Sequence, residues 1–188
     1  MAHISDLRAG IFTYLDINTV APLAATDTAA EYAALFVGST PGTANTADGD
    51  TTGVAGHYRM PSVREFPSVG TPANIVNVPV YGQKTSSQVQ GQADAPSLDV
   101  TINYNAADAD ELHKLVGKAV TFRFMMTDTA CTQDEAAAAT LAKANTMFYF
   151  NGKVEAILVN PSLTDATTAT VTLSTQSDFI GPATLAAS

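Results

Sequence analysis

The second half of the chain has the clearest alternation of apolar and polar residues. Between Ser97 and Tyr104 every second side chain is apolar, which predicts a strand with one buried face and one solvated face. The segments from Ala119 to Met125 and from Ala169 to Ser174 alternate in the same way, and the latter is expected to be the last strand. In the first segment the buried set is Leu98, Val100, Ile102 and Tyr104, and the solvated set is Ser97, Asp99, Thr101 and Asn103.

A tight hairpin is expected at Asn151 and Gly152. These residues separate two strand-like segments, Phe148 to Phe150 and Lys153 to Val159. An Asn-Gly pair tolerates positive φ angles and suits a two-residue turn between antiparallel strands. The sequence therefore predicts that the chain reverses direction here and continues as a strand to Pro161.

A short acidic helix is expected between the first two of these strands. Asn105 is a favourable N-cap, and Asp108, Asp110 and Glu111 lie near the positive end of the helix dipole. Gly117 is placed to end the helix. Its apolar face is formed by Ala109, Leu112 and Val116.

The N-terminal third is less regular. Ile11 to Leu15 suits a strand, and Thr28 to Glu31 has the spacing of a capping box ahead of apolar residues at helical intervals. The same segment, continued through Leu35 to Val37, also suits a strand, so both alternatives remain open. Gly38 to Gly56 has little to bury and predicts an exposed loop. Within it, Asp48 to Asp50 lacks the remaining ligands of a calcium loop.

The middle of the chain is interrupted by prolines and then becomes polar. Val54 to Met60 and Ser62 to Val69 predict short strands at a sheet edge, because prolines are excluded from sheet interiors. Extended structure is expected to continue from Ile75 to Tyr81. Gly82 to Pro96 contains a single large apolar residue, so it is either a loose hairpin or a segment that acquires partners elsewhere.

Thr127 to Asn145 is interpreted as an insertion between two strands. An alanine-rich helix is expected from Glu135 to Lys143, with few large residues to anchor it, so the insertion is expected to be mobile. Cys131 lies in this polar insertion and has no second cysteine in the chain, which excludes an internal disulfide and favours a reducing cytoplasm.

Length and charge limit the possible functions. A chain of 188 residues predicts one domain, with an N-terminal arm and loop at 1–53, a β core at 54–182 and a tail at 183–188. A net charge of -9 disfavours a nucleic-acid binder, because a surplus of lysine and arginine is needed to replace phosphate counterions. No signal peptide or segment of membrane-spanning length is recognised.

No catalytic motif accompanies the candidate reactive residues. His3, His57 and His113 have neither a nucleophile nor an orienting group at a recognised spacing. The acidic residues of the expected helix are explained by its dipole. We therefore expect no enzymatic activity, no cofactor and no metal.

The order of these elements resembles the tail tube proteins of long, non-contractile-tailed bacteriophages, whose fold group includes the tube proteins of contractile tails and type VI secretion systems. The resemblance covers about Val54 to Pro182. It is carried by Val63-Arg64-Glu65-Phe66-Pro67, Val69-Gly70-Thr71-Pro72, Tyr81-Gly82-Gln83-Lys84, Ser97 to Tyr104, Ala109 to Leu115, Val120 to Phe124, and Phe150 to Val159. The insertion at Thr127 to Asn145 is longer than the family pattern, and the segment before Val54 has no counterpart in it.

The resemblance implies a mainly β fold, a β-sandwich or barrel with one short flanking helix and long polar loops. It also implies a structural virion protein that forms hexameric rings, which stack into a hollow tail tube assembled in the host cytoplasm. DNA passes through the lumen without sequence-specific binding, and the other partners are the tape-measure protein and the tail-tip and terminator proteins. Candidate contacts between subunits or rings are Gln83, Lys84, Gln88, Gln90, Gln92 and Asp94.

Two alternatives remain open. One is a tube protein of a contractile tail or of a type VI-like secretion system. The other is a β-sandwich module that binds a receptor or glycan, which is expected to stay a small discrete oligomer rather than to form rings or filaments.

Overall fold

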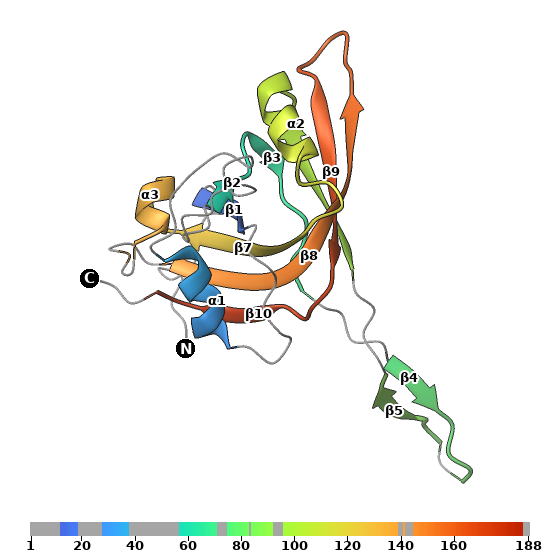
Figure 1. Ribbon diagram of the computed structural model, residues 1–188. Coiled ribbons are helices and arrows are strands. Elements are labelled where there is room, and N and C mark those ends of the chain that lie inside the picture. Colours follow the sequence, from blue (N-terminus) through green and yellow to red (C-terminus); the bar gives the residue numbers. More distant parts are fainter. Residues whose placement is uncertain are drawn as a thin grey trace.

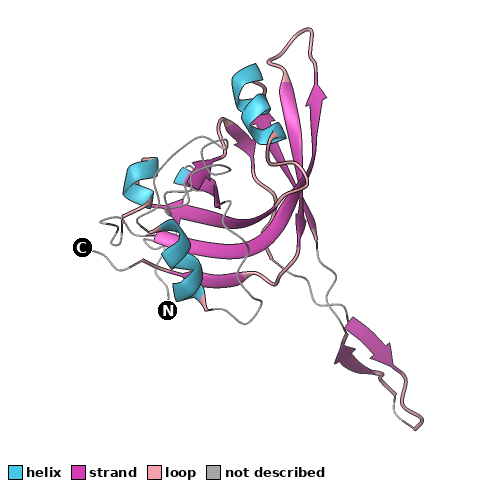
Figure 2. Ribbon diagram, viewed as in Figure 1, coloured by secondary structure: helices cyan, strands magenta, loops and turns pink. Residues whose placement is uncertain are grey.

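The computed structural model describes residues 12–18, 28–37, 57–70, 75–82, 84–91, 96–138, 141 and 145–185. This part of the chain is mainly β, as predicted (Figure 2). The strands are β1 (Thr13–Asn18), β2 (His57–Arg59), β3 (Val63–Glu65), β4 (Ile75–Val78), β5 (Ser87–Gln90), β6 (Ser97–Asn103), β7 (Ala119–Thr127), β8 (Asn145–Asn160), β9 (Thr168–Thr175) and β10 (Ile180–Ala183). The helices are α1 (Ala29–Phe36), α2 (Ala106–His113) and α3 (Gln133–Ala136), so the expectation of one flanking helix is too low.

One antiparallel sheet forms the body of the molecule. Its strand order is β2-β1-β7-β8-β9-β6-β3, and β10 pairs with β8 on the same side as β9. The sheet curls into a half-barrel, while β4 and β5 form a separate hairpin that projects from the body (Figure 1). Because β1 lies inside the sheet and α1 packs on it, the core also takes in part of the N-terminal segment.

The predicted hairpin at Asn151 and Gly152 is wrong. β8 is a single strand of 16 residues that passes straight through this pair. Gly152 lies between Val120 of β7 and Thr175 of β9, where a Cβ would clash with the Ser174 carbonyl oxygen. The glycine is therefore required by the close approach of a neighbouring strand and not by a turn.

The asparagine also has a packing role. The Asn151 side chain is buried, accepts a hydrogen bond from Thr121 Oγ1 at 3.0 Å and donates one to the Tyr32 hydroxyl at 2.8 Å. It thereby links β8 to β7 and to α1. Tertiary packing, and not the preference of an Asn-Gly pair for a turn, therefore determines the conformation of the chain here.

The sheet is buried against two clusters of apolar side chains, one on each face. The inner cluster fills the concave face of the half-barrel and includes the stacked rings of Phe122 and Phe150, whose centroids are 4.9 Å apart. The outer cluster lies on the opposite face of β7 and β8, where α1, α3 and nearby residues cover it. Its members are Tyr32, Phe36, Met125, Cys131, Ala136, Leu141, Met147 and Tyr149.

The short acidic helix is confirmed, with one change in its buried face. Asn105 is the N-cap of α2, and its Oδ1 accepts a hydrogen bond from the Ala107 amide at 3.1 Å. Ala109 and Leu112 are buried as expected, but Leu115 is buried in place of Val116, which is 38% exposed. The chain turns after His113, which rotates Val116 towards an isolated bridge with Val154 and leaves its side chain outside.

The open alternatives of the N-terminal third resolve in favour of a helix. α1 begins after Thr28, whose backbone amide donates to Glu31 Oε2 at 2.6 Å, so the capping box forms and the strand alternative is wrong. β1 covers Thr13–Asn18, which is displaced towards the C-terminus from the expected Ile11 to Leu15. The expected loop at Gly38 to Gly56 lies outside the described residues.

Other expectations also differ from the structure. Of the two proline-flanked strands, β3 is shorter than Ser62 to Val69, and β2 ends at Arg59, while residues 54–56 lie outside the described residues. β6 ends at Asn103, which leaves Tyr104 39% exposed instead of buried. β9 is followed by β10, so it is not the last strand. α3 starts earlier and is shorter than the expected Glu135 to Lys143 helix.

Candidate assembly surfaces

The β4–β5 hairpin has an apolar face that no other described part of the chain covers. Its two strands pair with each other, and the register places Val76 opposite Val89 and Val78 opposite Ser87 on one face. Val76, Val78 and Val89 are 49%, 41% and 54% exposed. Because an isolated two-stranded hairpin is marginally stable in water, this one gains stability from any surface that covers its valines.

The hairpin contains three of the six contact candidates predicted from the sequence. Lys84 and Gln88 are exposed in it, and Gln90 lies in β5 opposite Ile75. Gln83, Gln92 and Asp94 lie outside the described residues. The valine face was not predicted, although the alternate spacing of Val76, Val78 and Val80 is typical of a strand with one apolar face.

A second surface is one face of the sheet formed by β6, β9 and the part of β8 from Lys153 onward, which no other described part of the chain covers. On this face, which we call the hydroxyl face, Asp99 accepts a hydrogen bond from Thr172 Oγ1 at 2.8 Å and Glu155 accepts one from Ser174 Oγ. Lys153 is its only basic residue among those described. The register assigns to it Ser97, Asp99, Thr101 and Asn103 of β6, Thr168, Thr170, Thr172 and Ser174 of β9, and Lys153, Glu155, Ala156, Leu158 and Asn160 of β8.

A third surface is the free edge of β8. The first part of the strand, to Lys153, pairs with β7, whereas Ala156 to Asn160 pair with β9 on one side only, after a register shift at Glu155. On the other side the described residues provide a single bridge, from Val116 to Val154. Unpaired strand edges are templates for pairing with another chain, so this edge is suited to an intermolecular contact.

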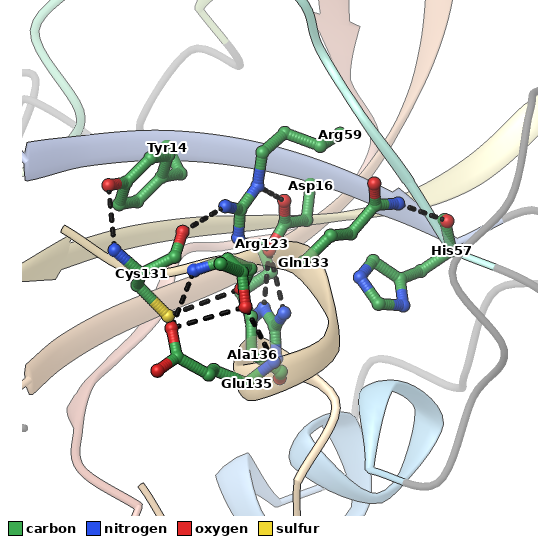
Figure 3. Close-up of polar contacts among 10 residues, drawn as sticks. Tyr14, Asp16, His57, Arg59, Arg123, Cys131, Gln133, Glu135 and Ala136 are labelled. Atoms are coloured by element: carbon green, nitrogen blue, oxygen red, sulfur yellow. Dashed lines mark hydrogen bonds and ion pairs between the residues drawn. The ribbon is translucent and has the colours of Figure 1, made fainter. Parts of the chain in front are cut away.

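The charged residues with the most extensive contacts are buried in the other half of the sheet (Figure 3). Asp16 of β1 lies between Arg59 of β2, whose Nε is 2.8 Å from Oδ1, and Arg123 of β7, whose Nη2 is 2.6 Å from Oδ2. Burial alone raises the pKa of Asp16, but the charges and hydrogen bonds of the two guanidinium groups outweigh it and hold the pKa below its ordinary value.

The same two arginines anchor the segment that contains α3. Arg59 Nη1 donates to the Cys131 carbonyl at 2.6 Å, and Arg123 Nη1 donates to the Ala136 carbonyl at 2.9 Å. The Cys131 amide donates to the Tyr14 hydroxyl at 3.0 Å. The described part of the insertion is therefore packed against the sheet, and Cys131 is a buried residue of the outer cluster instead of a thiol in a polar loop.

This buried network was not predicted, although the sequence contains an indication of it. Asp16 and Arg123 each stand within a run of apolar residues that forms a strand. A charge in such a run is expected to be paired when the strand is buried on both faces, because an unpaired buried charge is strongly unfavourable. The polar side of the strand from Ala119 to Met125 was instead expected to be solvated, and the residues that cover it were not predicted.

The histidines do not extend this network into a reactive site. His57 is buried in β2, and its burial lowers the pKa of the imidazole to about 4. His113 lies in the last turn of α2, and His3 lies outside the described residues. Within the described ranges no group of three or more His, Cys, Asp or Glu residues is arranged to hold a metal ion.

The helices of the described segments are all too short or too polar to cross a membrane.

Comparison with known proteins does not assign the chain to a family. No protein-family model matches the chain, and no curated protein is significantly similar to it.

Proposed function

We propose that this chain is a structural subunit of a phage tail tube, in which six copies close into a ring and rings stack around a channel for DNA. On this proposal the protein catalyses no reaction. Its contacts are with other copies of itself along the tube, and with tape-measure, tail-tip and terminator proteins at the tube's interior and ends.

The observation that carries the proposal is the asymmetry of the curled sheet. One half is covered on both faces, whereas β6, β9 and the second part of β8 keep a hydroxyl face that no other described residue covers and an edge that the described residues bridge only at Val154. Pairing of this edge with a neighbouring copy extends the sheet, and a closed ring leaves no edge free. The hydroxyl face then lines the ring.

The chemistry of the hydroxyl face suits a channel wall. DNA adheres to surfaces on which lysine and arginine replace condensed counterions. The hydroxyl face has one lysine and two carboxylates, and its remaining polar groups are hydroxyls and amides. The net charge of -9 acts in the same direction, so DNA phosphates are repelled weakly and are not held.

Electron microscopy of the concentrated, purified chain tests the proposal. We expect rings with a central hole, and stacks of rings at higher concentration. The variant Val159→Lys introduces a charge at the free edge and is expected to remain a folded monomer, because edge lysines prevent strand addition. Thr164→Lys, in the exposed loop after β8, is the matched control and is expected to assemble normally.

Closure of the ring through the free edge of β8 makes predictions that can fail. A chain that stays monomeric at every concentration, or a Val159→Lys variant that assembles as well as Thr164→Lys, contradicts edge closure. A small discrete oligomer without a hole favours the alternative of a receptor- or glycan-binding module.

A further inference from the structure

A cavity of about 440 Å³ lies at the corner where the two ends of the curled sheet are joined. β2 is the last strand at one end of the sheet order and β3 at the other, and only three residues separate them in the chain. We call this the corner cavity. Its apolar wall includes Met60, Val63 and Phe66, and its polar groups include Arg59, Ser62 and Gln133. An apolar wall with a few polar groups, at this volume, is typical of a site for a small molecule.

The turn that forms one wall of the corner cavity is fixed on both sides. The Met60 amide donates to the Leu15 carbonyl of β1, and the Asn103 amide of β6 donates to the Ser62 carbonyl, both at 2.9 Å. Ser62 has a φ of 51°, in the left-handed region that residues other than glycine rarely adopt. Because such a conformation persists only where its surroundings determine it, this wall is formed without a ligand.

The charge beside the corner cavity is not balanced. Among the described residues, Asp16 is the one carboxylate that pairs with Arg59 and Arg123, so two guanidinium groups share a single negative charge. Arg123 is fully buried, whereas the side chain of Arg59 is 15% exposed and lines the cavity. An excess of positive charge at the border of a low-dielectric interior attracts an anion.

Arg59 also has donors to spare. Of the five N–H bonds of a guanidinium group, three donate here, two to Asp16 and one to the Cys131 carbonyl oxygen. The remaining two, one on each Nη atom, have no acceptor among the described residues. The Tyr14 ring, whose centroid is 4.1 Å from the Arg59 Cζ atom, fixes the plane of the group. A planar group of this kind is suited to a carboxylate.

We propose that the corner cavity binds a small organic acid, whose carboxylate lies on Arg59 and whose apolar body lies against Met60, Val63 and Phe66. Gln133 supplies a further donor, because its Nε2 uses one N–H on the His57 carbonyl, at 2.7 Å, and retains the other. The ligand class is a monocarboxylate with an aromatic or short aliphatic body. The site goes beyond the proposed function and does not depend on it, since it is built within one chain.

Titration of the purified chain with 3-phenylpropionate, followed by NMR at a concentration below that of assembly, tests the proposal. We expect saturable shifts of the Met60 and Val63 methyl signals and of the Ser62 amide signal. Acetate has the charge without the apolar body, and 3-phenylpropionamide has the body without the charge. Both are expected to bind at least about tenfold more weakly than the acid.

Two substitutions of Ser62 separate charge from shape. Aspartate and asparagine both tolerate a φ of 51°, but only aspartate adds a negative charge to the wall of the cavity. We expect Ser62→Asp to weaken binding of 3-phenylpropionate at least about tenfold, while Ser62→Asn binds it like the unaltered protein. Arg59→Lys keeps the positive charge without the planar fork and should also weaken binding. Circular dichroism verifies folding, and the Ser62 pair decides the question where Arg59→Lys does not fold.

The proposal fails if 3-phenylpropionate causes no saturable shifts, if the acid and its amide bind equally, or if Ser62→Asp and Ser62→Asn bind the acid equally. Each of these outcomes leaves the tube proposal intact, because none concerns the formation of rings. A chain that binds the acid but never forms rings overturns the tube proposal and retains the corner cavity as a binding site.

Discussion

The two halves of the curled sheet differ in how many of their faces are buried. In the half made by β1, β7, β10 and the first part of β8, side chains are covered on both faces, by the inner cluster and by α1 and α3. In the half made by β6, β9 and the second part of β8, the inner face is buried and the hydroxyl face is in solvent. The first half is complete within one chain, whereas the second offers a face and an edge to other molecules.

Charged groups are used differently in the two halves. Asp16 and Arg123 are fully buried and paired, and they fasten strands and the α3 segment together. Asp99, by contrast, is exposed and bonded to one hydroxyl. We therefore expect the free energy of unfolding to depend mainly on the half that is covered on both faces. Assembly should depend on the open half, which has the hydroxyl face and the free edge.

The largest expected effect comes from breaking the buried network. Arg123→Met leaves Asp16 buried with one guanidinium and removes a donor from the Ala136 carbonyl, so we expect a loss of about 3–5 kcal/mol in the free energy of unfolding. Arg64→Met removes an exposed ion pair with Asp165 and should cost less than about 1 kcal/mol. Chemical denaturation of both variants measures the difference, and equal losses would contradict the comparison.

The next largest effect is a dependence of the free energy of unfolding on pH, which arises from His57 in the covered half. The pKa of His57 falls from 6.5 to about 4 on folding, mainly through burial, with further lowering by Arg123 and Arg59 that Asp16 opposes. The folded state therefore binds the proton less readily than the unfolded chain. This contribution to stability is complete above pH 6.5 and is lost as the pH falls towards 4, by up to about 3 kcal/mol.

Denaturation at several pH values between 7 and 4 measures this loss. His57→Gln should have a flatter profile over the same interval, since the other titrating groups are unchanged. Asp16, whose pKa is also lowered, keeps its full contribution to stability well above its unfolded value of 3.8 and begins to lose it only at the acidic end of this interval, equally in both proteins. Parallel profiles for the two proteins would show that His57 is not the titrating group.

A smaller effect is expected where the two halves meet at β8. Gly152→Ala places a methyl group against the Ser174 carbonyl oxygen and should cost about 1–3 kcal/mol, because neighbouring backbone must shift. Gly82→Ala strains a residue with φ of 86° in the hairpin, which is not part of the body. Unfolding of the body should therefore be unchanged by Gly82→Ala, and an equal loss in both variants would be inconsistent with a continuous β8.

The smallest effect is expected on the hydroxyl face. Asp99→Asn loses at most one exposed hydrogen bond, from Thr172, and should change the free energy of unfolding by no more than about 0.5 kcal/mol. Asp16→Asn leaves the buried guanidinium of Arg123 and the partly buried one of Arg59 facing a neutral amide and should destabilise the protein several-fold more. Calorimetry of the two variants at pH 7 makes the comparison.

The strands of the half with the solvated hydroxyl face were easier to predict from the sequence than those of the covered half. A strand with one buried and one solvated face alternates strictly, so β6 and β9 followed from their residues. β7 is buried on both faces, and although Arg123 within an apolar run indicates a paired charge, the pattern of one strand does not identify the partners that cover Thr121 and Arg123. The continuity of β8 was not predictable, because the neighbour that excludes a side chain at Gly152 is Ser174, distant in sequence.

The candidate contact surface was predicted only in part. The polar composition of Gly82 to Pro96 left a hairpin open as one alternative, and β5 of this segment does pair with β4, while its role in contacts remains a prediction. The apolar face of the hairpin depends on the register that pairs Val76 with Val89, and register is set by both strands together. The free edge of β8 likewise depends on where β7 ends relative to β9, which is a property of the assembled sheet.

Hydrogen exchange of the chain before and after assembly tests the central claim most directly. In the monomer, amides of Glu155 to Asn160 that do not bond to β9 should exchange quickly, while amides of Ala119–Thr127 should be protected throughout. On ring formation the first group should become protected and the second should not change. Rings that form while this edge still exchanges quickly, or a monomer in which it is already protected, would contradict closure of the sheet between copies.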